Sequence, residues 1–232
     1  MHDPRIDQLA KQLVRYSTKT KKGDNVLIDL FDVPEAVGIA LIREVRAAKG
    51  TPFVNVHQAK ISREMGRGAT EEQYAIIAKN AMHQMKSMDC YIAIRGSHNV
   101  NEMADVPAAK MQMLSTKMRP VLNQRVNKTR WCVLRWPHAS MAQSAGMSTE
   151  AFEDIYFRVC LLDYKKLSKG MKALETLMTK TNDVHLKGPG TDLKFSIKDI
   201  PAIACGGNHN IPDGECFTAP VKDSVEGVIS YN

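Results

Sequence analysis

The 232-residue chain lacks several features that would assign it to a common functional class. No apolar run reaches the roughly 18 residues that a membrane-spanning helix needs, so we do not expect a membrane protein. Neither a G-x-G-x-x-G nor a G-x-x-x-x-G-K-[ST] string occurs, which argues against the two common nucleotide-binding loops. The five cysteines form no C-x-x-C pair. This cysteine usage is typical of reduced thiols in a cytoplasmic protein.

Aromatic residues are also scarce, at 6% of the chain, although the formal net charge is +7. A nucleic-acid binder usually gathers its basic residues on one face and interleaves them with aromatic side chains. Here lysine and arginine are spread along the chain. We therefore interpret the charge as solvated surface and expect no nucleic-acid partner. The hydrophobic fraction of 44% is enough for a globular core.

Strand-like and helix-like segments alternate in the first part of the chain. Short apolar strands are expected at 26–30, 53–56, 90–94 and 131–134, with helical segments between them. This alternation predicts an α/β fold with a parallel sheet covered by helices. Ligands of such sheets tend to bind beyond the carboxyl ends of the strands. The polar residues expected at those ends are Asp29, Asp32, His57, Arg95, Ser97, His98 and Arg135.

The pattern becomes β-like in the last quarter of the chain. Two short expected strands, 184–187 and 193–197, flank a turn at Gly188-Pro189-Gly190. We therefore predict an α/β domain over residues 1–180, followed by the beginning of a β-rich metal-binding domain over residues 181–232.

The last expected strand, Gly227-Val228-Ile229-Ser230-Tyr231-Asn232, has no later segment to pair with. Such a strand would leave backbone hydrogen-bonding groups and apolar surface uncovered. We therefore expect that the sequence is a fragment of a longer protein, or that a second polypeptide completes it.

The most concentrated chemistry surrounds Ile211-Pro212-Asp213-Gly214, which predicts a tight turn. Proline presets its own φ and glycine accepts a positive φ. Glu215 follows directly, and Pro220 closes the segment. A carboxylate held on a stiff backbone between two prolines is well placed to bind a cation. The alternative is an ordinary hairpin turn with a solvated glutamate.

Several strings of this sequence resemble the thermophilic metalloprotease family that includes aminopeptidase T and aminopeptidase S. Almost the whole chain is covered, in the family's order. The strings are Asp89-Cys90-Tyr91-Ile92-Ala93-Ile94-Arg95-Gly96, Trp131-Cys132-Val133-Leu134-Arg135-Trp136-Pro137, Met141-Ala142-Gln143, Gly146-Met147-Ser148-Thr149, Gly190-Thr191-Asp192-Leu193, Phe195-Ser196-Ile197, Asn210-Ile211-Pro212-Asp213-Gly214-Glu215 and Thr218-Ala219-Pro220.

The resemblance implies a cytoplasmic homodimer that removes amino-terminal residues from peptide substrates. It also implies two divalent metal ions, which could be zinc, cobalt or manganese. Glu215 matches the first metal-binding glutamate of the family, in the Pro-Asp-Gly-Glu motif. The family's other ligands and its catalytic tyrosine lie past the end of this sequence, so no catalytic residue is carried over. His209 is close to Glu215 in sequence but matches no family ligand, and we expect a loop residue there.

A dinuclear centre needs several ligands, so one carboxylate is not enough to hold two ions. We expect Asp213 to fix the turn and Asp192 to support the site from outside the metal's ligands. Two alternatives stay open. Some relatives of the family are mononuclear iron dioxygenases that cleave a dihydroxypyridine ring. The chain could also be a catalytically inactive fragment that acts only in folding or dimerisation.

Overall fold

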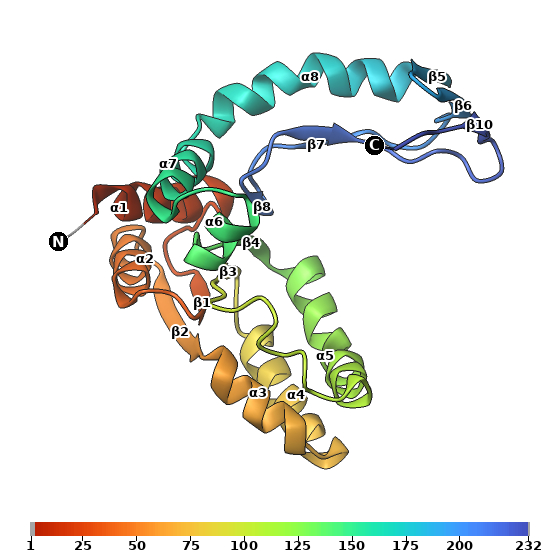
Figure 1. The fold of residues 1–232 in the computed structure, drawn as a ribbon. Helices are drawn as coiled ribbons and strands as arrows, with labels where there is room; N and C mark the ends of the chain where they lie inside the picture. The colour runs from red at the N-terminus through yellow and green to blue at the C-terminus, as the bar shows by residue number, and fades with distance from the viewer. Residues whose placement is uncertain (1–2, 232) are drawn as a thin grey trace. The chain divides into compact units, whose positions relative to one another are not determined.

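The computed structural model describes residues 3–231, which form two compact units (Figure 1). Unit 1 takes the described residues up to Leu161 together with Gly207–Pro212. Unit 2 takes Leu162–Gly206 and the described residues from Asp213 onward. The two compact units divide after Leu161, earlier than the boundary expected after residue 180. The expected domain boundary stays a prediction.

Unit 1 is built on a five-stranded sheet in which every neighbouring pair is parallel. The strand order is β2-β1-β3-β4-β8, so the sequence passes from β1 outward to β2 and then crosses to the other side of β1. This confirms the predicted parallel sheet. The strands are β1 (Asn25–Phe31), β2 (Thr51–His57), β3 (Cys90–Arg95), β4 (Arg130–Arg135) and β8 (Asn210–Ile211).

Helices cover both faces of this sheet. Thr70 and Ser148 each start a helix by accepting a backbone N–H in the first turn, at 3.1 and 3.3 Å. Among residues 3–231, no helix combines the length and the apolar character that a membrane span requires. The helices of unit 1 are α1 (Pro4–Lys11), the π-helical turn η1 (Gln12–Ser17), α2 (Glu35–Ala47), α3 (Ala59–Gly68), α4 (Glu71–Lys86), α5 (Ala108–Lys128), α6 (Ala139–Ser144) and α7 (Thr149–Cys160).

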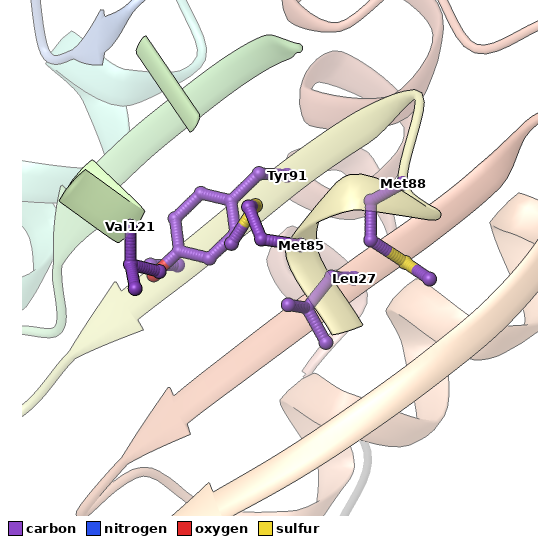
Figure 2. Close-up of a cluster of buried hydrophobic side chains, with 6 residues drawn as sticks. Leu27, Met85, Met88, Tyr91 and Val121 are labelled. Carbon is purple, nitrogen blue, oxygen red and sulfur yellow. The ribbon is translucent and has the colours of Figure 1, made fainter. Parts of the chain in front are cut away.

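The core of unit 1 follows from the alternation of side chains along the strands. Leu27 of β1 is paired with Tyr91 of β3, and both point to the face covered by α4 and α5. Figure 2 shows them in a buried cluster with Met85 and Val121. Residues of opposite parity, such as Leu30, face α2 instead. Because both faces are covered, the strands can be apolar throughout, as the sequence predicts.

Three loops meet tightly at the carboxyl end of the sheet. Asp32, just after β1, has a φ of +47°, and its carbonyl accepts a hydrogen bond from Nε2 of His138 at 2.7 Å. Gly96, just after β3, donates its N–H to the Phe31 carbonyl at 2.7 Å. A Cβ on Gly96 would overlap both the His138 ring and the Asp32 carbonyl oxygen. The close approach of these loops therefore requires glycine at this position.

Unit 2 consists of one helix and two small antiparallel sheets. The hairpin of β5 and β6 turns at Gly188–Pro189–Gly190, as predicted. The final strand was expected to have no later segment to pair with; its described part, β10, pairs instead with the earlier strand β6. Asn232 lies outside the described residues. The elements are α8 (Tyr164–Lys180), β5 (Asp183–Gly188), β6 (Thr191–Ser196), β7 (Ile203–Cys205), β9 (Glu215–Phe217) and β10 (Glu226–Val228).

The junction at the carboxyl end of the sheet gives a direct test of the fold. We expect Gly96→Ala to lower the free energy of unfolding of unit 1 by about 1–3 kcal/mol, because the added methyl group forces the His138 ring or the Asp32 backbone to move. Both tryptophans, Trp131 and Trp136, lie in unit 1, so urea unfolding followed by tryptophan fluorescence reports on this unit.

Gly68→Ala is the matched control, since a Cβ there meets nothing within 4 Å. Its effect should stay within about 0.5 kcal/mol. Equal unfolding midpoints for the two variants would contradict the tight junction around Gly96.

Candidate metal centre

The Asn-Ile-Pro-Asp-Gly-Glu string is divided between the two units. Ile211 is buried in β8, where it pairs with Leu134 of β4, so the first part of the string is anchored in the parallel sheet. The chain then leaves unit 1 after Pro212, and Asp213 is the first residue of the next segment of unit 2. The string therefore begins in the parallel sheet of unit 1 and ends in unit 2, where Glu215 is the first residue of β9.

The turn before Glu215 is held by contacts inside unit 2. The buried Tyr164 hydroxyl of α8 accepts the N–H of Asp213 at 3.2 Å. The Asp213 carboxylate accepts the N–H of Gly214 at 3.0 Å. Gly214 has a φ of +135°, which favours glycine, and a Cβ there would come within 3.0 Å of Leu167. Asp213 thus bonds to the turn itself, and the turn rests on α8.

Glu215 presents its carboxylate on an exposed position of the β7–β9 ribbon. Within residues 3–231, this carboxylate has no hydrogen-bond or ion-pair partner. Its backbone is nevertheless fixed, because Glu215 lies opposite Cys205 in the antiparallel ladder. An unengaged carboxylate on an ordered backbone can accept a cation without first losing a protein partner.

Cys205 is half-buried directly across the ribbon from Glu215. Burial raises the pKa of its thiol, and the carboxylates of Asp213 and Glu215 raise it further by their negative charge. The same charges that disfavour a bare thiolate would favour a bound cation. Sequence reasoning missed Cys205, because only the strand register brings it beside Glu215.

Asp192 lies elsewhere in unit 2, on β6 of the three-stranded sheet. Its exposed carboxylate oxygen is 2.7 Å from Nε2 of His185. Asp192 is therefore engaged with a residue of its own hairpin. Its supporting role at the metal stays a prediction.

The described residues supply only part of a metal centre. Within residues 3–231, no group of three or more His, Cys, Asp or Glu side chains is arranged to hold a metal ion. The donors that are close to one another, Glu215 and Cys205, fit the ligand chemistry of zinc or cobalt, but a closed site needs further donors. His209 belongs to unit 1, where its ring packs against Trp131 with 4.6 Å between centroids.

A second polar feature is a cleft of about 470 Å³ at the carboxyl end of the parallel sheet in unit 1. The structure brings three of the polar residues expected at that edge, Asp32, His57 and His98, into its wall. His138 also lines it, and the His98 and His138 rings lie 4.2 Å apart. The other expected residues, which do not line the cleft, are Asp29, Arg95, Ser97 and Arg135.

Asp29 does not line the cleft, although its carboxylate lies 3.7 Å from Nε2 of the cleft residue His57. Its carboxylate accepts the hydroxyl of Tyr91 at 2.8 Å and the side-chain amide of Asn55 at 2.9 Å. With Tyr91, Asp29 points to the face of the sheet that α4 and α5 cover. Its environment is therefore set by the alternation of side chains along β1 and not by its position near the end of the strand.

The fold is similar to those of two solved structures. The chain superposes on wild-type AmpT from Thermus thermophilus with a TM-score of 0.79 at 20% identity, covering 97% of this chain and 63% of that one. It also matches 2,5-dihydroxypyridine dioxygenase from Pseudomonas putida KT2440, with a TM-score of 0.55 at 14% identity, covering 98% of this chain and 59% of that one. The chain thus spans less than two thirds of the length of either protein.

A search of curated proteins by sequence finds no match. A family model does match, and it spans residues 2–232, nearly the whole chain. That model describes the thermophilic metalloproteases (M29), a family of metal-dependent peptidases. The chain therefore belongs to the thermophilic metalloprotease family.

Proposed function

We propose that the protein is a metal-dependent aminopeptidase that releases amino-terminal residues from peptides. Membership of the thermophilic metalloprotease family supports a peptide substrate and a divalent metal cofactor. The resemblance of the Asn-Ile-Pro-Asp-Gly-Glu string to the aminopeptidases of that family supports the amino-terminal selectivity. The observation that carries the proposal is the position of Glu215, an exposed and unengaged carboxylate at the end of a fixed turn.

Glu215 would act as an oxygen ligand of the metal. Its backbone is ordered by the β7–β9 ladder and by the hydrogen bond from Asp213 to Tyr164, so little backbone entropy is lost when the carboxylate binds. Divalent ions bound there would lower the pKa of a coordinated water and polarise the scissile carbonyl. Asp213 would keep the turn in place through Gly214, and Asp192 would support the site from β6.

Three further features belong to the same proposal and rest on the family resemblance. The ions are two in number and are zinc, cobalt or manganese. The protein is a homodimer, and it works in the cytoplasm. The remaining ligands come from residues other than those described here, because residues 3–231 hold no group of three suitable donors.

Removal of one charge tests the role of Glu215. We expect Glu215→Gln in the full-length protein to lower zinc affinity by about 10–100-fold or more and to abolish release of leucine from leucyl-p-nitroanilide. The amide keeps the shape of the side chain but loses the charge that offsets the ion's dehydration. Isothermal titration with zinc, together with the activity assay, measures both effects.

Glu226→Gln is the control, because Glu226 is also an exposed strand residue of unit 2 but lies on β10. It should bind zinc and hydrolyse substrate like the parent protein. Unchanged zinc affinity in Glu215→Gln would refute the assignment of Glu215.

A ring-cleaving dioxygenase with one iron ion is the second candidate. The fold shared with 2,5-dihydroxypyridine dioxygenase favours it, although the TM-score of 0.55 is lower than the 0.79 for AmpT. A third possibility is that the chain is inactive and serves only folding or dimerisation.

Metal exchange separates these three. We expect the chelated protein to lose peptidase activity and to regain it with Zn²⁺, Co²⁺ or Mn²⁺, because the ions supply the water activation. Oxygen-dependent opening of a dihydroxypyridine with Fe²⁺, and no release of amino acids, would favour the dioxygenase. Dialysed protein without stoichiometric metal and without either activity would favour the inactive alternative.

A further inference from the structure

One side of helix α8 contacts the segment that carries Glu215. The contacting residues are spaced three and four positions apart, which places them on the same side of the helix, and they are Tyr164, Leu167 and Met171. Tyr164 is 1% exposed and Met171 is 8% exposed. Leu167 lies so close to Gly214 that a Cβ there would come within 3.0 Å of it. The segment therefore rests on the buried side of α8.

The hydrogen bonds to α8 lie on both sides of Glu215 along the chain. Before it, the Tyr164 hydroxyl accepts the N–H of Asp213 at 3.2 Å. After it, the Met171 carbonyl accepts the thiol of Cys216 at 3.7 Å. Neither bond uses the carboxylate of Glu215. The helix thus restrains the backbone around Glu215 and leaves its carboxylate available.

The β7–β9 ladder alone holds Glu215 weakly. The ladder has three residue pairs, and Glu215 is in the last of them, opposite Cys205. The end of a short ladder opens more easily than its middle. The hydrogen bond from Asp213 to Tyr164 restrains the chain two residues before Glu215, outside the ladder. Without that hydroxyl, the Asp213 N–H would lose this partner and the turn would be freer to move.

We propose that Tyr164 is a positioning residue for the metal centre, and that its buried hydroxyl fixes the Asp-Gly-Glu turn and thereby sets the affinity of Glu215 for the metal. This inference rests on the proposed function, since it takes Glu215 as a ligand. At 1% exposure, Tyr164 is enclosed by protein, so it acts through the backbone of the turn. A mobile Glu215 would lose more conformational freedom on binding a cation, which weakens binding without removing the ligand.

Removal of the hydroxyl tests the inference. We expect Tyr164→Phe in the full-length protein to bind Zn²⁺ about tenfold more weakly than the parent, as measured by isothermal titration. At saturating Zn²⁺, its kcat on leucyl-p-nitroanilide should return to within about threefold of the parent value, because Glu215 itself is unchanged. This recovery separates a positioning role from a general loss of folded protein.

Tyr156→Phe is the matched control. Tyr156 is also a buried tyrosine, at 8% exposure, and its hydroxyl donates to the Arg135 carbonyl at 2.8 Å in unit 1. The substitution removes the same atom without touching the turn, so the zinc affinity should stay at the parent value. Equal zinc affinities for Tyr164→Phe and Tyr156→Phe would overturn the inference.

Hydrogen exchange on the unsubstituted protein gives a test that needs no variant to fold. If the position of the turn sets the metal affinity, metal binding must stabilise the turn through the same coupling. Saturating Zn²⁺ should therefore slow exchange of the Asp213 amide more than exchange of the Tyr156 amide in α7. An Asp213 amide that exchanges at the same rate with and without bound Zn²⁺ would also overturn the inference.

The outcomes distinguish this inference from the proposal beneath it. If Glu215→Gln weakens zinc binding but Tyr164→Phe binds zinc like the parent, the positioning role fails and the peptidase proposal stands. If Glu215→Gln leaves zinc binding unchanged, the assignment of Glu215 fails and the role of Tyr164 fails with it. Weaker zinc binding in both variants, with activity recovered by excess Zn²⁺ only in Tyr164→Phe, supports both.

Discussion

The register between β7 and β9 is the constraint on which the proposed centre depends. Side chains alternate between the two faces of a strand, so a slip of one residue would move Glu215 to the face that Cys216 now occupies. The ladder is short, from Ile203 opposite Phe217 to Cys205 opposite Glu215, and cannot fix its own register strongly. The contacts with α8 do so instead. The Tyr164 hydroxyl accepts a hydrogen bond from the N–H of Asp213, and the Met171 carbonyl accepts one from the thiol of Cys216.

Unit 1 supplies a different kind of rigidity. The parallel sheet is buried on both faces, and Ile92 at its centre is fully inaccessible to solvent. Its loops meet at the carboxyl end, where Gly96, Asp32 and His138 approach too closely for any larger residue at position 96. The short strand β8 ties Asn210 and Ile211 to β4 of this sheet. Asn210 and Ile211 are thus fixed within unit 1.

Much of the architecture could be predicted from the sequence, because the signals were local. Apolar runs such as Cys90–Ile94 marked the buried strands, and Gly188-Pro189-Gly190 marked the hairpin. Strand β8 escaped prediction because two residues carry no periodic pattern. The partner of β10 also escaped, because its pairing with β6 is not local in sequence.

The candidate centre was only partly predictable for the same reason. The family motif identified Glu215, and the turn before it follows from proline and glycine. Cys205 lies ten positions before Glu215, and nothing in the spacing of these two residues indicates that they are neighbours. Their proximity comes from the ladder, which is a property of the folded unit. Conversely, Asp29 had the expected strand position, but its environment is set by Tyr91 and Asn55.

The most direct test of the central claim is a crystal structure of the zinc-loaded full-length protein, with anomalous diffraction collected at the zinc edge. We predict an anomalous peak within coordination distance of a Glu215 carboxylate oxygen, about 2.0–2.2 Å away. A fully occupied zinc site whose ligands do not include Glu215 would contradict it.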